Sequence, residues 1–466
     1  MATTQYSHAF LVGLFNGKRS KLKNLVNSGW TRECVTQDGN IYKTDDDDNP
    51  RKRYAEDQGY NGLCSVYYKA HIDAMLEEGD KYGNPLTGNK PNFLKDVSHY
   101  FKEVNNKITL CYIEDLTDSN GKTLDHYSLV IQRLHLYFFP LDTVFFAIEI
   151  DDTGSELNDL TMGHFLLSTW AWEGSTRFTD STKDDLKNAL SPLLSLLNGN
   201  DPLELLESGN KLKIFQTIQV SAEEVDDALL YEIATSSPIG CVNNPDRFIS
   251  PSQEYVENII KNNGVSAFKK WKGLALVDSF TILGTVKGFR KNDCNYMYFP
   301  LIYLRCLFEK TFCFTRNIAY RENKAKKKLY SETMQMEQYY FYENISYNFL
   351  PNMLYKAMAK SLDIESEREG LSRQIKERHK KRNNQLLSAI SVFAIFSVIF
   401  DLYSLVKAWA TDTTLIPTEN NAFNFCPALL SNSYDNGELP LFSLILFVIA
   451  LSLSVLSIWY LNSKRR

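Results

Sequence analysis

Two long apolar stretches stand out in the hydropathy pattern near the C-terminal end of the chain. Leu386 to Val406 contains a single charged residue, Asp401, and Leu439 to Leu461 contains none. At 1.5 Å per residue, a helix over the first stretch measures about 31 Å, which matches the hydrocarbon core of a bilayer. The pattern therefore predicts two transmembrane helices, over residues 386–406 and 439–461.

The charges that flank these stretches predict their orientation. Between them, residues 411–438 hold four acidic side chains and no Lys or Arg. The outer flanks are basic, with Arg373, Lys376, Arg378, Lys380, Lys381 and Arg382 before the first stretch and Lys464, Arg465 and Arg466 after the second. Because positive charge is retained on the cytoplasmic side, both termini are expected in the cytoplasm.

The first three hundred residues carry mixed signals for strands and helices. Strand-like runs predict strands at 108–113, 127–136, 143–150, 212–220 and 280–283. Helical periodicity is found at 157–172, 183–197 and 252–271, and again from about residue 296. The N-terminal hundred residues look less regular. We therefore predict a cytoplasmic α/β ligand-sensing domain over residues 1–318.

A helical stalk is predicted between this domain and the membrane, over residues 319–385. Pro351 should end or kink one helix and start another, and no proline follows before the first apolar stretch. An unbroken helix from Asn352 into the membrane is expected, with Gly370 as its weakest point. The fold class is thus an α/β domain, long stalk helices and a two-helix transmembrane hairpin at 386–466.

Composition narrows the choice of function. The 466 residues have a net charge of -5, which argues against direct nucleic-acid binding because such proteins usually carry clustered basic residues. The eight cysteines include no C-x-x-C pair, so neither a zinc site nor a disulfide framework is indicated. The early apolar run Phe10 to Phe15 is too short for a signal peptide.

Catalytic and phosphate-binding motifs do not appear. Gly121-Lys122-Thr123 ends like a P-loop, but Leu116 occupies the position of the upstream glycine. The seven histidines show no metal-ligand spacing, and there is no G-x-S-x-G sequence. The chain is therefore expected not to be an enzyme and to need no metal or cofactor, and no ligand-binding residue is assigned.

Polar residues at the first apolar stretch are candidates to line a pore. Asn384, Ser388 and Ser391 share one helical face, and Asp401 lies nearly opposite. The alternatives are close helix packing for the hydroxyls and an interfacial position for Asp401. A cytoplasmic basic ring is predicted from the three residues just before the stretch, which otherwise serve topology and headgroup contact: Lys380, Lys381 and Arg382.

The order of these parts resembles the CorA superfamily: a cytoplasmic α/β domain, a long helix leading into the first span, a short external loop, and a second span with a basic tail. Locally, Arg382-Asn383-Asn384-Gln385-Leu386-Leu387 resembles the R-x-N-x-x-L pattern at the start of the first span in that family. The resemblance implies a homo-oligomer, usually a pentamer, whose first spans surround a central pore.

One departure from that family changes the expected function. Its Mg²⁺ transporters carry Gly-Met-Asn at the outer end of the first span, where this chain has Lys407-Ala408-Trp409-Ala410-Thr411. Enlarged relatives without this motif resemble the CorA-like membrane effectors of type III CRISPR antiviral defence, which bind a nucleotide messenger, S-adenosylmethionine conjugated to AMP, and act on the host membrane.

The resemblance therefore implies a ligand-gated effector or channel in the bacterial inner membrane, activated by a small nucleotide. One alternative is a divalent metal cation channel or transporter without the Gly-Met-Asn filter. The other is a membrane-tethered scaffold whose spans serve only as an anchor.

Overall fold

The computed structural model describes residues 4–15, 25, 28–36, 41–43, 51–52, 78–79, 97–117, 123–141, 143–169, 177–197, 211–222, 224–244, 250–285, 294–322, 326–346 and 348–411. The chain divides into two compact units, Met1–Leu371 and Ser372–Arg466. Each unit is treated separately below.

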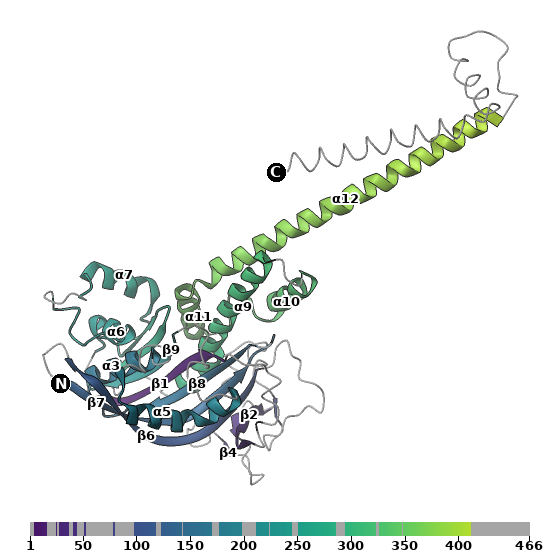
Figure 1. Cartoon of the computed structure of the whole chain (residues 1–466). Helices are drawn as coiled ribbons and strands as arrows, with labels where there is room; N and C mark the ends of the chain where they lie inside the picture. Colours follow the sequence, from purple (N-terminus) through teal and green to yellow (C-terminus); the bar gives the residue numbers. More distant parts are fainter. Residues whose placement is uncertain are drawn as a thin grey trace. The chain divides into compact units, whose positions relative to one another are not determined.

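The first unit is built on one mixed sheet (Figure 1). Within the described ranges its strand order is β10-β11-β12-β9-β1-β8-β7-β6-β2-β3-β4, with β5 paired to β2. Most neighbours are antiparallel, whereas β12 is parallel to β9 and β5 is parallel to β2. The strands are β1 (Thr4–Leu14), β2 (Thr31–Thr36), β3 (Ile41–Lys43), β4 (Arg51–Lys52), β5 (Glu78–Gly79), β6 (Ser98–Thr117), β7 (Thr123–Phe138), β8 (Val144–Asp151), β9 (Lys213–Val220), β10 (Gly264–Val265), β11 (Trp271–Ala275) and β12 (Ser279–Thr285).

Strand β1 lies at the centre of this sheet, between β8 and β9. The expectation of an irregular N-terminal region was wrong for this segment. Its continuous apolar run has no period of two, because both faces of the strand are buried. The five strands predicted from the sequence are present, within β6, β7, β8, β9 and β12.

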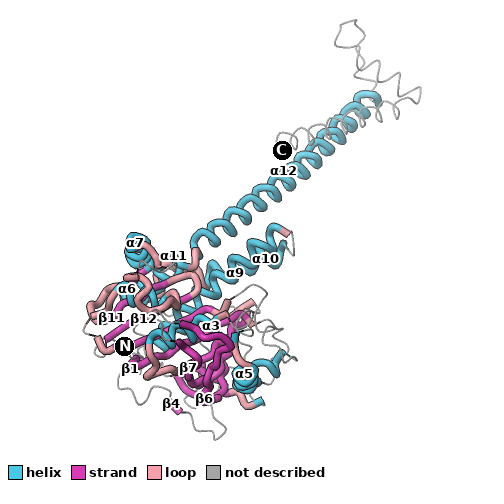
Figure 2. Tube along the Cα trace, turned by 60° about the vertical axis from the view of Figure 1, so that its left-hand side comes forward, coloured by secondary structure: helices cyan, strands magenta, loops and turns pink. Residues whose placement is uncertain are grey.

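Helices pack on both faces of the sheet. Figure 2 shows the strands in magenta and the helices in cyan. The first face, which carries the side chain of Gln216, packs against α3 (Leu157–Ser168), α5 (Asp180–Leu194), α6 (Asp227–Ala234) and α7 (Gln253–Asn263). A short 3-10 helix, η4 (Ser195–Leu197), extends α5. Leucines of α5 pack on β6 and β7, and Ile233 of α6 packs near Ile218 of β9.

The second face, which carries Phe10 and Phe215, is covered by a π-helical segment and the helix that follows it. These are η6 (Cys294–Tyr303) and α9 (Leu304–Arg321). Phe299 of η6 stacks on Phe10 with ring centroids 3.9 Å apart and also contacts Phe215. The helix predicted from residue 296 thus exists, but its first part is a π-helix that includes Pro300.

The helix predicted over 252–271 was too long. Helix α7 ends at Asn263, and Gly264 begins strand β10. A side chain at Gly264 would place its Cβ 2.3 Å from the carbonyl oxygen of Ile260, so the close turn requires glycine. Trp271 then begins β11, because residues 271–275 pair with β12 and complete the edge of the sheet.

Three further helices follow α9: α10 (Lys326–Tyr339), α11 (Phe349–Ser361) and α12 (Ile364–Thr411). The single helix predicted from Asn352 is instead two helices. The chain breaks at Leu362 and Asp363, and Asp363 adopts a positive φ of 53°. Gly370 lies inside α12 and does not interrupt it.

Helix α12 starts in the first unit and continues without a break into the second. Its 48 residues correspond to a length of about 72 Å. The helix is long and apolar enough to cross a membrane, and none of its apolar window is buried. The predicted span over 386–406 lies on this helix, whereas the span predicted over 439–461 lies outside the described residues.

Candidate functional site

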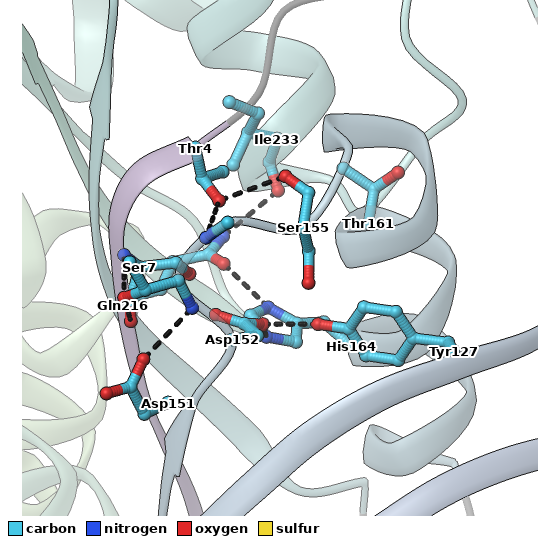
Figure 3. A network of polar contacts seen from close by, with 12 residues as sticks. Thr4, Ser7, Tyr127, Asp151, Asp152, Ser155, Thr161, His164, Gln216 and Ile233 are labelled. Carbon is cyan, nitrogen blue, oxygen red and sulfur yellow. Dashed lines mark hydrogen bonds and ion pairs between the residues drawn. The ribbon is translucent and has the colours of Figure 1, made fainter.

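A buried polar network joins helix α3 to the first face of the sheet (Figure 3). The Tyr127 hydroxyl of β7 donates to Asp152 Oδ2 at 2.5 Å, and His164 Nε2 of α3 lies 2.7 Å from the same oxygen. His164 Nδ1 lies 2.9 Å from Gln216 Oε1 on β9. All four side chains are buried.

The protonation of His164 follows from its neighbours. Gln216 Nε2 donates to the backbone oxygen of Ile233, and a carbonyl only accepts, so Gln216 presents its own oxygen to His164. Both imidazole nitrogens therefore donate. Burial alone would lower the pKa of His164, but the Asp152 carboxylate outweighs it and raises that pKa. His164 and Asp152 form a buried ion pair.

A second polar network lies on the opposite face, around Glu149 of β8. The Glu149 carboxylate is fully buried between two imidazoles, with His8 Nε2 at 3.0 Å and His135 Nε2 at 2.7 Å. His99 Nε2 lies 3.0 Å from His135 Nδ1, and Arg133 Nη1 is 3.8 Å from the carboxylate. Burial opposes ionisation, yet the hydrogen bonds from His135 and His8 hold the pKa of Glu149 well below its usual value.

The two networks differ in how firmly their protons are placed. The contact between His99 and His135 joins two ring nitrogens, so it holds one proton that either ring can carry. In the first network, by contrast, the Ile233 carbonyl fixes the direction of the hydrogen bonds. The second network can therefore change its hydrogen bonding without breaking its geometry.

Polar atoms without a hydrogen-bond partner lie beside the second network. Thr217 is the register partner of His8 across β9, and its Oγ1 is buried and unpaired within the described part of the chain. Asn295 of η6 donates to Tyr6 Oη at 2.6 Å, while its own Oδ1 is buried without a donor. Tyr6 stacks on His8. This corner therefore offers a hydroxyl and an amide oxygen to a bound group.

Helix α9, which continues from η6, connects the sheet to the other helices. Its fully buried Arg305 donates through Nε to Glu309 Oε1 at 2.8 Å and through Nη2 to the Tyr340 carbonyl. The Tyr355 hydroxyl of α11 donates to Glu309 Oε2 at 2.9 Å. Burial raises the pKa of Glu309, although the Arg305 guanidinium opposes that change.

The same helix α9 holds the beginning of α12. Asn317 Nδ2 donates to Glu367 Oε2 at 2.8 Å and to the Glu367 carbonyl at 3.1 Å, and Lys310 Nζ lies 3.1 Å from Oε1. The Ile364 and Leu371 side chains are buried on either side of this contact. The first two turns of α12 are thus fixed to α9.

Along the rest of α12 the apolar side chains are exposed around most of the circumference. The exposed residues are Leu386, Leu387, Ile390, Phe393, Ile395, Val398 and Phe400. Soluble helices keep a polar face, so this distribution is typical of a helix that contacts lipid.

The residues predicted to line a pore all lie on α12. Ser388 Oγ donates to the Asn384 carbonyl and Ser391 Oγ to the Leu387 carbonyl, each at 2.8 Å, so both hydroxyls are satisfied within the helix. Asp401 is exposed, as are Lys380 and Lys381. The pore and the basic ring, which also includes Arg382, remain predictions.

Sequence reasoning assigned no ligand site and gave no role to the Glu149 network. Among the described residues, no group of three or more His, Cys, Asp or Glu side chains is arranged to hold a metal ion. Gly121 and Lys122 of the rejected phosphate motif lie outside the described residues. No protein-family model matches the chain, and neither does a curated protein or a solved structure.

Proposed function

We propose that this chain is a CorA-like, ligand-gated membrane effector, in which the first unit binds a small molecule and α12 carries the response into the bilayer. The observation that carries the proposal is the continuity of α12. One unbroken helix begins among buried contacts with α9 and continues into an apolar segment that is largely exposed.

The second face of the sheet is the sensing surface in this proposal. Its unpaired polar atoms belong to Thr217 and Asn295, and Asn295 lies at the start of η6, which runs directly into α9. A ligand that pairs with these atoms changes the position of η6 on the sheet. Because Asn317 of α9 is hydrogen-bonded to Glu367, that change reaches α12 through contiguous contacts.

The remaining features of the proposal come from the sequence. The ligand is a nucleotide messenger, S-adenosylmethionine conjugated to AMP, and the setting is type III CRISPR antiviral defence. The protein resides in the bacterial inner membrane as a homo-oligomer, with a second span over 439–461 and both termini in the cytoplasm. The acidic loop at 411–438 is then external.

Expression in bacteria tests the proposal directly. Cells that make the full chain should grow normally without the messenger and should lose membrane potential when the messenger is synthesised. Glu367→Gln should bind the messenger with wild-type affinity but cause less depolarisation, because it weakens the contacts from Lys310 and Asn317. The matched control is Glu369→Gln, at an exposed position on the same turn of α12.

Three results would contradict the proposal. Depolarisation without any messenger would indicate an ungated channel, which is the divalent-cation alternative. Equal activity of the Glu367 and Glu369 variants would show that α9 does not control α12. Messenger binding without an effect on the membrane would show that the spans serve only as an anchor.

A further inference from the structure

A basic and aromatic surface lies on the first unit, away from the contacts described above. It forms where residues 258–277 meet residues 345–362. The Phe268 and Phe349 ring centroids are 6.3 Å apart, and Lys360 Nζ donates to the Asn262 carbonyl at 3.1 Å. The basic–aromatic surface consists of Lys261, Phe268, Lys269, Lys270, Phe349, Lys356 and Lys360.

The charge on this surface is of one sign. The two segments contain six lysines and no Asp or Glu, although 56 of the 466 residues in the chain are acidic. Lys272 pairs with Asp227 of α6 at 2.6 Å. The other five form no ion pair within the described part of the chain, and all five are exposed. A surface of this kind attracts anions.

Exposed aromatic rings lie among these lysines. Phe268 is 41% exposed and Phe349 is 60% exposed, although both are large apolar side chains. Phe268 stacks on the buried Trp271 with centroids 5.3 Å apart, which holds its ring at the surface. Ammonium groups around exposed aromatic rings suit the headgroup layer of a membrane, where the rings reach the acyl boundary and the charges stay in water.

We propose that the basic–aromatic surface binds anionic phospholipid headgroups of the same bilayer that α12 enters. The inference rests on the membrane insertion of α12 that is proposed above. A lipid partner is favoured because α11, which carries part of the surface, ends at Ser361 and α12 begins at Ile364. The surface is thereby tethered near a membrane, and its charge complements the anionic cytoplasmic leaflet.

This contact has a geometric consequence. From Leu371 to Leu386 the chain is helical, which corresponds to about 22 Å. A helix of this length links the surface to the membrane segment, so in this proposal the lipid composition of the leaflet becomes an input to gating.

Lysine labelling of the full chain in lipid nanodiscs tests the proposal. The protein is reconstituted in phosphatidylcholine alone and in a 3:1 mixture of phosphatidylcholine and phosphatidylglycerol, then acetylated briefly and analysed by mass spectrometry. We expect anionic lipid to slow acetylation of Lys269, Lys270 and Lys356 by at least about threefold, and 0.5 M salt to remove the protection. Lys183 and Lys187 of α5 should react equally in both lipids.

Charge reversal gives a second readout. The double variant Lys269→Glu and Lys270→Glu should abolish the lipid-dependent protection of Lys356, whereas the control Lys183→Glu and Lys187→Glu should leave it unchanged. Resistance of every sample to alkaline extraction from liposomes reports insertion separately.

The outcomes are distinct. Equal labelling in both lipids by an inserted protein would overturn the lipid inference and leave the proposed function intact. A protein that does not insert would contradict the membrane function itself and, with it, the lipid contact.

Discussion

Breaking the buried ion pair between Asp152 and His164 should destabilise the first unit strongly, because it leaves an uncompensated buried charge. Asp152→Asn keeps the shape of the side chain but removes the charge that both His164 and the Tyr127 hydroxyl contact. Removing one partner of a buried pair costs about 3–5 kcal/mol. For a unit that extends from Met1 to Leu371, we expect the thermal midpoint to fall by about 4–6 °C.

The adjacent carboxylate provides a matched control. Asp151 points to the other side of the strand, is partly exposed, and accepts from Gln132 Nε2 and the Thr153 amide, both at 2.9 Å. Asp151→Asn should cost only about 1 kcal/mol. Thermal unfolding of both variants in detergent, followed by tryptophan fluorescence, measures the difference. Equal midpoints for the two variants would refute the assignment of a buried charge pair.

The pH dependence of this difference has a defined sign. His164 has a folded pKa raised above 6.5, so its contribution is complete below pH 6.5 and is lost as the pH rises through the folded pKa. Asp152 has a folded pKa lowered below 3.8, so its contribution is present above pH 3.8 and is lost as the pH falls through the folded pKa. The Asp152→Asn penalty should be largest between these limits and should decrease in alkaline solution.

Three further outcomes are expected. Gly163→Ala should lower the free energy of unfolding by about 1–3 kcal/mol in urea titrations, because the added Cβ would lie 2.3 Å from the Tyr127 ring. Phe393→Lys should disfavour insertion of α12 by about 2.5–3.5 kcal/mol in a glycosylation reporter assay, whereas Phe314→Lys on α9 should not. Ion selectivity or leak in reconstituted vesicles should change, with messenger affinity unaltered, when Gln replaces the three residues of the basic ring, Lys380, Lys381 and Arg382.

The sequence predicted the strands better than their arrangement. Runs rich in β-branched and aromatic residues located β7 and β8. Strand β1 was missed because its short apolar run reads the same in a strand and in a buried helix. Its position between β8 and β9 depends on pairing with residues more than 130 positions away.

The break before α12 had a signal in the sequence. Asp363 precedes an apolar residue, and Glu365 and Glu367 fall in the first turn that follows. Acidic side chains at this position favour a helix start, because they face the positive end of the helix dipole. A helix can therefore end without a proline, and the acidic residues from Asp363 onward predict two helices here.

The Glu149 network had a weaker signal. Arg133 and His135 alternate with buried leucines on β7, and Glu149 interrupts the apolar run of β8. Polar residues in such strands must find partners when buried. The sequence indicated that partners were needed but not which ones, because His8, His135 and Glu149 meet only through the register of three strands.

The free energy that the proposed gating would require is compatible with the contacts available at the second face. Changing a two-state equilibrium from 1:99 to 99:1 requires a ligand that prefers one state by about 5.5 kcal/mol. Hydrogen bonds to charged groups contribute about 1.5–3 kcal/mol each, and neutral ones about 1 kcal/mol. A ligand that pairs with Glu149, Thr217 and Asn295 in only one position of η6 therefore supplies most of this preference. This second face is the one covered by η6 and α9, the elements that lead to α12.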